Sequence, residues 1–221
     1  MMTNEVEGVG QVRAIVPLRS IKKSKTRLSE LNAHDRAKLT AAMFRNVLLA
    51  LRNARKVSDI TVVSRDRSAS RIARQYGAKF LLEGKGHGLN RAVRLAIQSL
   101  DQEAVRAAMI IHADLPLVKS RDIEKFLTES QGSQIAIVPC KNGTGTNALL
   151  LAHPKAIRPA FGKGSYRTHL ALAKKTGLRC KVMRIRGIQF DMDDPRDLRR
   201  FIRYDGLNGS FSFLKRSTNR N

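Results

Sequence analysis

The sequence has few cysteines and no long hydrophobic run, and these two shortages exclude several classes of protein. Cys140 and Cys180 lie far apart and outside any CxxC or Cys/His pattern, so we expect neither a zinc site nor a disulfide framework. No run reaches the roughly 18 consecutive apolar residues that a membrane span needs. Residues 1–11 are polar and acidic and lack the apolar core of a signal peptide. We therefore expect a cytoplasmic protein that does not enter a membrane.

Acidic and aromatic residues are also scarce. The chain has 18 Asp and Glu against 42 Lys and Arg, which gives a formal net charge of +24. This balance favours polyanionic partners, either nucleic acid or phosphorylated small molecules. The basic residues are spread along nearly the whole chain, so a solvated basic surface explains them equally well. Aromatic residues make up only 5% and tryptophan is absent, which argues against a protein that stacks RNA bases on aromatic side chains.

Length and residue periodicity predict one α/β domain. The 221 residues, 42% of them hydrophobic, suffice for one well-buried domain and are few for two. Strand-like runs alternate with helical runs, which predicts a mostly parallel sheet with helices on both faces. The expected strands are 12–18, 59–64, 78–82, 107–112, 134–139, 147–152 and 181–185, and the expected helices are 34–53, 68–76, 89–100, 120–129, 165–175 and 195–204. We expect a flexible N-terminus at 1–11, a single domain at 12–204 and a disordered tail at 205–221.

Asp114 is the first candidate for chemistry. It follows the most apolar strand, 107–112, and Pro116 prevents a simple continuation of that strand. Ligands of such sheets bind at the carboxyl ends of the strands, so Asp114 should lie at the ligand site. Its carboxylate could hold Mg²⁺, which prefers one or two carboxylates together with substrate phosphates. The alternative is an aspartate that caps a helix or closes a turn.

Asp191 and Asp193 form a second acidic candidate. If their segment is extended, alternate residues point the same way and the two carboxylates share a side. They would then repel each other unless a cation lies between them. Asp194 precedes Pro195, which suits the first position of a helix, so the acidic cluster could equally be a capping segment. Together with Asp114, the pair makes a candidate site for one or two Mg²⁺ ions.

Several loops could bind phosphate. Loop 19–27 (RSIKKSKTR) follows the first strand, where α/β folds bind nucleotide phosphates, but it has no glycine and is not a Walker loop. Loops 141–147 and 161–165 contain glycines that can turn backbone N–H groups toward an anion. In segment 86–90 (GHGLN), Asn90 could bond a base or ribose, or cap the following helix. Each of these could also be an ordinary turn, and the histidines form no visible constellation.

Seven short motifs occur in an order that resembles one family. They are PLRx5KTRL (17–28), VVSRD (62–66), GLN (88–90), ADLPL (113–117), GTGTNAL (143–149), FGxGS (161–165) and DxDxPxDL (191–198). Each motif is weak alone, but the set in this order is specific and spans about 12–204. The chain resembles CofC, called FbiD in some bacteria, the guanylyltransferase of coenzyme F-420 biosynthesis.

The resemblance implies a fold, a reaction and a set of residues. The fold is that of the nucleotide-diphospho-sugar transferases, and a homodimer is suggested. The reaction transfers GMP from GTP to 2-phospho-L-lactate, phosphoenolpyruvate or 3-phospho-D-glycerate and releases pyrophosphate. The matching positions are Asp114, Asp191 and Asp193 for Mg²⁺; Thr146, Gly162 and Ser165 for the acid; Lys25 and Arg27 for the GTP phosphates; and Asn90 near the guanosine. The family usually has threonine where this chain has Asp194.

Two other functions remain open at this point. One is another Mg²⁺-dependent nucleotidyltransferase that uses CTP or a sugar phosphate, although the glycine-rich first loop of many such enzymes is missing here. The other is a basic RNA-binding protein, which the composition disfavours. The three carboxylates also argue against a catalytically dead relative that only senses nucleotide.

Overall fold

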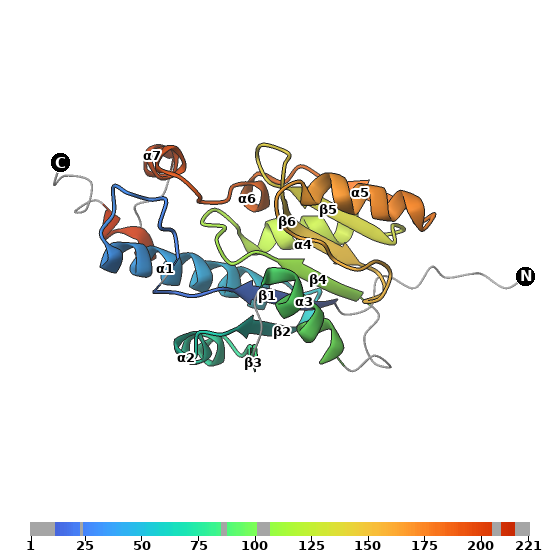
Figure 1. Ribbon diagram of the computed structural model, residues 1–221, viewed down its shortest axis with the longest axis horizontal. Helices are drawn as coiled ribbons and strands as arrows, with labels where there is room; N and C mark the ends of the chain where they lie inside the picture. The colour runs from blue at the N-terminus through green and yellow to red at the C-terminus, as the bar shows by residue number, and fades with distance from the viewer. Residues whose placement is uncertain (1–11, 23, 85–87, 101–106, 205–208, 215–221) are drawn as a thin grey trace, which may run out of the picture.

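The computed structural model describes residues 12–22, 24–84, 88–100, 107–204 and 209–214. Their strands form one seven-stranded sheet in the order β3-β2-β1-β4-β6-β5-β7 (Figure 1). The strands are β1 (Val12–Leu18), β2 (Val57–Ser64), β3 (Lys79–Leu82), β4 (Ala107–Ile111), β5 (Ile135–Pro139), β6 (Thr146–Leu151) and β7 (Cys180–Val182). Strand β6 runs antiparallel to β4 and β5, and the other neighbours are parallel. The predicted mostly parallel α/β sheet is confirmed.

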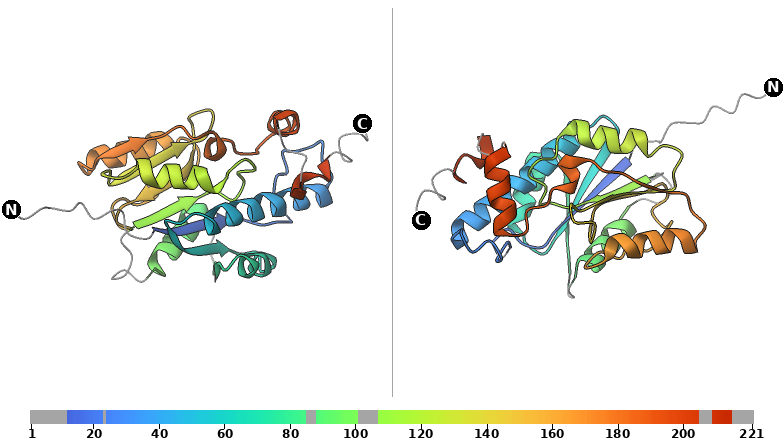
Figure 2. Two further views of the ribbon diagram at one scale, coloured as in Figure 1. Left: turned by 180° about the vertical axis from the view of Figure 1, so that it is seen from behind. Right: turned by 90° about the horizontal axis from the view of Figure 1, so that it is seen from above.

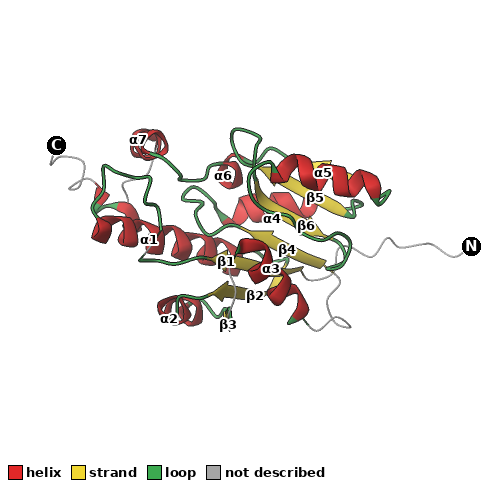
Figure 3. Cartoon of the chain, in the orientation of Figure 1, coloured by secondary structure: helices red, strands yellow, loops and turns green. Residues whose placement is uncertain are grey.

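Helices cover both faces of this sheet (Figures 2 and 3). Helices α1, α2 and α4 pack on one face, and α3 and α5 pack on the other. The helices are α1 (Ala33–Arg52), α2 (Ser68–Gln75), α3 (Leu89–Gln98), α4 (Ser120–Glu129), α5 (Ser165–Lys175), α6 (Arg186–Gln189) and α7 (Pro195–Tyr204), followed by a 3-10 helix, η1 (Gly209–Phe211). The four-residue helix α6 was not predicted, because the sequence analysis assigned no element between the expected strand 181–185 and the acidic segment that begins at Asp191. None of the helices in the described ranges is long and apolar enough to cross a membrane.

The central strands are apolar throughout because both of their faces are covered. In β1, Ala14 and Val16 face the layer that contains α1, whereas Ile15 faces the layer that contains α3. All five residues of β4 are buried. A strand buried on both sides has no solvent-facing position, which is why the sequence shows a continuous apolar run. The first polar side chains after β4 are therefore forced to its carboxyl end, where Asp114 lies.

A third apolar cluster lies beyond the sheet, against the first half of α1. It joins Leu28 and Leu31 to Leu198 and Phe201 of α7 and to residues of the C-terminal segment. In Figure 1, α7 and the red η1 segment flank the end of α1 that projects past the sheet. Phe211 and Leu214 are 8% and 0% exposed. The structure thus differs from the expectation of a disordered tail in 209–214, because these apolar side chains have a surface to bury against.

Candidate active site

The loop between β1 and α1 is held in place by the end of β2. Asp66 accepts hydrogen bonds from the Ser20 hydroxyl (3.1 Å) and the Ile21 backbone N–H (2.8 Å). Burial alone would raise the pKa of Asp66, but hydrogen bonds from Ser68, Ile21 and Ser20 hold it below its ordinary value. The carboxylate therefore stays charged, and it fixes the start of the basic loop over the carboxyl edge of the sheet.

Lys25 of this loop bridges two of the predicted metal ligands. Its Nζ lies 2.6 Å from Asp114 Oδ2 and 3.0 Å from Asp193 Oδ1. Lys25 has φ of +57°, a left-handed backbone conformation that is uncommon for residues other than glycine. The loop, β4 and the segment before α7 are thereby joined at one point, as the position of Asp114 after β4 predicts.

The ion pair also settles the charge states of its members. Burial opposes charge on the Lys25 ammonium, but Asp114 and then Asp193 outweigh it, so the pKa of Lys25 is raised. Burial would likewise raise the pKa of Asp114, but the charge of Lys25 and then that of His112 hold it below its usual range. Both groups are therefore ionised at neutral pH.

Asp191 is the exception among the three aspartates. Burial, followed by repulsion from Asp193 and Asp114, raises the pKa of Asp191 to about 6. Its Oδ1 atom and Asp114 Oδ1 are both buried and lack a hydrogen-bond partner in the described part of the chain. The nearest ammonium to Asp191 Oδ1 is Lys141 Nζ, at 4.0 Å. Carboxylate oxygens left without partners in a negatively charged corner are suited to a cation.

Hydrogen bonds from β6 and the neighbouring loop place Asp191 at this corner. Asn147 Nδ2 donates to the carbonyls of Ile188 (2.9 Å) and Gln189 (3.1 Å), and the backbone N–H of Lys141 also donates to Gln189 (3.0 Å). These bonds pin α6 across the carboxyl edge of the sheet. The next residues then reach β4, where the Met192 N–H donates to the Asp114 carbonyl (3.2 Å).

Asp194 and Asp197 shape the turn into α7. Asp194 Oδ1 accepts from the backbone N–H groups of Arg196 (2.8 Å) and Asp197 (3.1 Å), so Asp194 caps the helix as its place before Pro195 suggests. Asp197 is buried, accepts from the N–H of Asp193 (2.9 Å) and pairs with Lys141. The capping alternative therefore holds for Asp194, whereas Asp193 contacts Lys25 and Asp191 lies within range of the charges of Asp193, Asp114 and Lys141.

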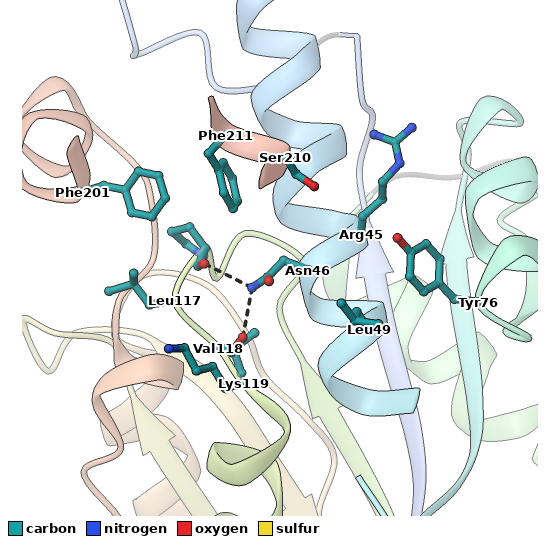
Figure 4. A pocket seen from close by; sticks show the side chains of 11 residues that line it. Arg45, Asn46, Leu49, Tyr76, Leu117, Val118, Lys119, Phe201, Ser210 and Phe211 are labelled. Carbon is teal, nitrogen blue, oxygen red and sulfur yellow. Dashed lines mark hydrogen bonds between the residues drawn. The ribbon is translucent and has the colours of Figure 1, made fainter. Parts of the chain in front are cut away.

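The loop that carries Asp114 is anchored from α1 by Asn46 (Figure 4). One amide group, Asn46 Nδ2, donates to the carbonyls of Val118 (3.0 Å), Pro116 (3.1 Å) and Leu115 (3.3 Å). Asn46 also lines a cavity of about 280 Å³ whose walls include Phe201, Phe211 and other residues but none of the predicted site residues. Asn46 was missed by the sequence analysis because an asparagine within a helix carries no signal of a partner 69 residues away.

Thr146, one of the three predicted acid-binding residues, belongs to a second cluster around His169 and Phe161. Thr146 Oγ1 lies 3.0 Å from His169 Nδ1, and the backbone N–H of Ala160 lies 2.9 Å from His169 Nε2. Asn90 exchanges two hydrogen bonds with the backbone of Phe161, at 2.6 and 2.9 Å. The Phe161 ring is 5.1 Å from that of His169 and 5.4 Å from that of His112, measured between centroids.

Comparison with known proteins assigns this chain to a family. A family model described as "Guanylyl transferase CofC like" matches residues 12–217. The chain belongs to this family. The protein is therefore a nucleotidyltransferase, as expected from its motifs.

Named relatives agree with this assignment, and a solved structure shares the fold. The phosphoenolpyruvate guanylyltransferase of Sphaerobacter thermophilus is 36% identical over 84% of this chain and 89% of the relative. The 2-phospho-L-lactate guanylyltransferase of Methanocaldococcus jannaschii is 33% identical over 85% of this chain and 81% of the relative. A protein from Desulfovibrio desulfuricans G20, assigned as a nucleotide-diphospho-sugar transferase, superimposes with a TM-score of 0.74 at 16% identity, covering 95% and 96% of the two chains. The expected nucleotide-diphospho-sugar transferase fold is confirmed.

The predicted site of this CofC-like guanylyl transferase converges only in part. Lys25 contacts both Asp114 and Asp193. Asp191 lies close enough to these two aspartates for their charges to add to the effect of burial on its pKa. Arg27 is exposed and has no ion pair within the described ranges. No group of three or more Asp, Glu, His or Cys side chains in those ranges is arranged to hold a metal as it stands. Lys25 bridges two of the carboxylates instead, so a metal ion would have to share or replace its contacts.

The structure places the residues predicted to bind the acid and the nucleotide as follows: Gly162 and Ser165 lie in one turn, and Asn90 bonds the backbone of Phe161. Gly162, with φ of +132°, and the buried Ser165 form the turn into α5, where the Ser165 N–H donates to the Gly162 carbonyl (3.1 Å). Asn90 does not cap α3, and its amide is occupied by Phe161, so its contact with guanosine stays a prediction. Residues 86 and 87 of the predicted segment 86–90 lie outside the described residues.

Proposed function

We propose that this protein transfers GMP from GTP to the phosphate of a small phosphorylated carboxylic acid in coenzyme F-420 biosynthesis. The acid is 2-phospho-L-lactate, phosphoenolpyruvate or 3-phospho-D-glycerate, and pyrophosphate is the second product. The observation that carries the proposal is the contact of Lys25 with Asp114 and Asp193, in a chain whose relatives are named guanylyltransferases for two of these acids.

We further propose Mg²⁺ as the metal of the reaction. The residues fit a hard divalent cation, because two buried carboxylate oxygens, Asp114 Oδ1 and Asp191 Oδ1, lack partners in the described part of the chain. Asp114, Asp191 and Asp193 would hold the ion. When bound, Mg²⁺ would neutralise charge on the reacting phosphates.

The chain's own residues then position and neutralise the reactants. An oxygen of the acid's phosphate attacks the α-phosphorus of GTP in line, forming a new P–O bond. The bond from the α-phosphorus to the bridging oxygen breaks, and its electron pair leaves with pyrophosphate. The attacking phosphate is already ionised at neutral pH, so no strong general base is needed. Lys25 and Arg27 stabilise the leaving pyrophosphate, while Thr146, Gly162 and Ser165 hold the acid.

The reaction is tested by pyrophosphate release from GTP and Mg²⁺, run separately with each of the three acids. CTP and ATP serve as control nucleotides. Release that requires GTP and one acid would establish the reaction and identify the acid. Release with CTP but not GTP would favour another nucleotidyltransferase. If no acid and no nucleotide gave pyrophosphate release, and the protein bound RNA in a salt-dependent way, the RNA-binding alternative would replace the proposal.

A further inference from the structure

His169 lies at the junction of the two segments that the proposed function assigns to the acid. Thr146 begins β6, and loop 161–165 leads into α5. His169 Nδ1 contacts Thr146 Oγ1. His169 Nε2 contacts the backbone N–H of Ala160, the residue that precedes loop 161–165. Its ring is 0% exposed, and Thr146 is 1% exposed. A buried polar ring with both nitrogens bonded is held in one orientation.

The two partners of His169 define its tautomer. A backbone N–H can only donate, so Nε2, which faces the Ala160 N–H at 2.9 Å, must present its lone pair. A neutral imidazole with a lone pair on Nε2 carries its hydrogen on Nδ1. A protonated ring would point a second N–H at the Ala160 N–H and lose that bond.

Burial keeps the ring neutral. Desolvation first, and then the positive charge that His112 can carry, lower the pKa of His169 to about 4. The ring is therefore neutral across the physiological pH range, with the Nδ1–H tautomer that the hydrogen bonds require.

The tautomer determines what Thr146 can do. Nδ1–H lies 3.0 Å from Thr146 Oγ1 and donates to it. The Thr146 oxygen is thus an acceptor, and its own hydroxyl hydrogen must go to another acceptor. The described residues offer Thr146 Oγ1 no second hydrogen bond. An anionic oxygen of a bound ligand would supply the missing acceptor.

We propose that His169 is the positioning residue of the acid site. It orients the Thr146 hydroxyl as a donor to an anionic oxygen, either phosphate or carboxylate, of the phosphorylated acid. Through Ala160 it also fixes the start of the loop that carries Gly162 and Ser165. This inference rests on the proposed function, since that function assigns Thr146 to the acid.

The tautomer of His169 can be tested by a measurement that does not depend on enzyme activity. Long-range ¹H–¹⁵N NMR spectra of protein labelled at histidine distinguish Nδ1–H, Nε2–H and doubly protonated rings. We expect His169 to show Nδ1–H without titration between about pH 5.5 and pH 8. The resonance is assigned by its loss in His169→Gln. An Nε2–H tautomer, or titration within this range, would overturn the inference.

The positioning role is tested by steady-state kinetics. His169→Gln removes the donor to Thr146, whereas His169→Asn can place an amide N–H near the Nδ1 position. We expect His169→Gln to raise the KM for the acid about tenfold, the effect of losing one hydrogen bond to a charged group, with the KM for GTP unchanged. His169→Asn should recover part of this loss. His153→Gln, at an exposed histidine, is the matched control.

A double-mutant cycle with Thr146→Val separates positioning from general destabilisation. If His169 acts through Thr146, adding His169→Gln to Thr146→Val should leave the KM for the acid nearly unchanged. Additive effects, or equal increases in both KM values, would overturn the positioning role while leaving the reaction intact. If His169 variants do not fold, Thr146→Val against Thr146→Ser tests the hydroxyl, and the NMR experiment tests the ring, with the His169 resonance assigned through its contact with the Phe161 ring. A folded wild-type protein that is silent with every acid would overturn the proposed function, and the positioning role with it.

Discussion

At the scale of single residues, charge in the site is balanced by one lysine shared between two carboxylates. Lys25 contacts Asp114 and Asp193, while Asp191 is left partly uncompensated, with its pKa raised to about 6 by burial and by its acidic neighbours. A site with this imbalance favours an additional cation. Under the proposed function, the GTP phosphates would compete with the aspartates for Lys25, and Mg²⁺ would compete with Lys25 for the aspartates.

Asp114→Asn should leave a folded protein with severely reduced turnover. Asparagine keeps the size of the side chain but removes the charge that pairs with Lys25. We expect turnover to fall by about 10²–10³-fold, the effect of losing one electrostatic contact to the reacting groups. Pyrophosphate release measures turnover, and circular dichroism verifies the fold. Asp59→Asn, which alters a surface ion pair with Arg13, is the control. Near-normal turnover of Asp114→Asn would remove Asp114 from the mechanism.

The buried His169 should make stability depend on pH. Its folded pKa of about 4 lies below the ordinary value of 6.5, so the unfolded chain binds more protons between these values. The free energy of unfolding should therefore fall as the pH drops from about 6.5 to about 4, by up to about 3 kcal/mol from this group.

Urea unfolding at several pH values tests this dependence against His169→Gln. The variant should be less stable at neutral pH but should lose less stability on acidification. His112, whose pKa is also lowered by burial, is present in both proteins, so the difference between them reports the part of the pH dependence that requires His169. Identical pH dependence in the two proteins would contradict a buried, neutral His169.

At the scale of secondary-structure elements, each functional loop is held by a side chain from a different element. Asp66 after β2 holds the basic loop, Asn46 of α1 holds the loop after β4, and Asn147 of β6 holds α6. Each anchor bonds backbone groups, whose positions are then independent of the side chains that the loop carries. Loops anchored in this way hold the side chains that they carry at fixed positions along the carboxyl edge of the sheet.

Asn46→Asp should weaken both stability and catalysis. A carboxylate of the same shape cannot donate to the three carbonyls that Asn46 now satisfies. We expect a loss of about 1–3 kcal/mol in urea unfolding, because the loop carbonyls lose their donor. Turnover should fall as well, since Asp114 moves with the loop. Leu49→Ala, on the same helix and 46% exposed, is the control and should change neither quantity appreciably. If Asn46→Asp changed neither the free energy of unfolding nor the turnover, the loop would be shown to keep its shape without this anchor.

Asp194→Ala separates helix capping from metal binding. Asp194 bonds the first backbone N–H groups of α7, so its loss should cost about 1 kcal/mol of unfolding free energy. Because Asp194 caps the helix, turnover at saturating Mg²⁺ should stay close to that of the wild type. Asp193→Asn should show the opposite result, with stability nearly kept and turnover lost. A large loss of turnover in Asp194→Ala would place this carboxylate among the metal ligands.

At the scale of the whole molecule, the third apolar cluster closes the structure around α1. Three stretches of the chain, 28–43, 190–201 and 211–214, meet there, and the last of them contains Phe211 and Leu214. A chain truncated after Tyr204 should therefore be less stable by about 2–5 kcal/mol, the cost of emptying a large buried site. A chain truncated after Leu214 is the control and should retain its stability. Equal urea midpoints for both truncations would show that the C-terminal segment contributes nothing.

Much of this organisation could be predicted from the chain alone. Periodicity identified the strands and the main helices, since burial of β4 on both faces leaves an uninterrupted apolar run. The end of the apolar run placed Asp114 at the carboxyl edge of the sheet, where it meets Lys25. Pro195 and Asp194 indicated the start of α7. These features are local, because each depends on residues within a few positions of one another.

The contacts that complete the site are not local, and they depended on the fold. Lys25 meets Asp114 across 89 residues and Asp193 across 168 residues. His169 and Thr146 are 23 residues apart, and the sequence analysis saw no arrangement among the histidines. The sheet order brings the ends of β1, β4 and β6 together, and no pattern in the chain encodes which side chains then face each other. Short-range periodicity specified the elements, whereas charge pairing, proton position and loop anchoring arose only when distant elements packed against each other.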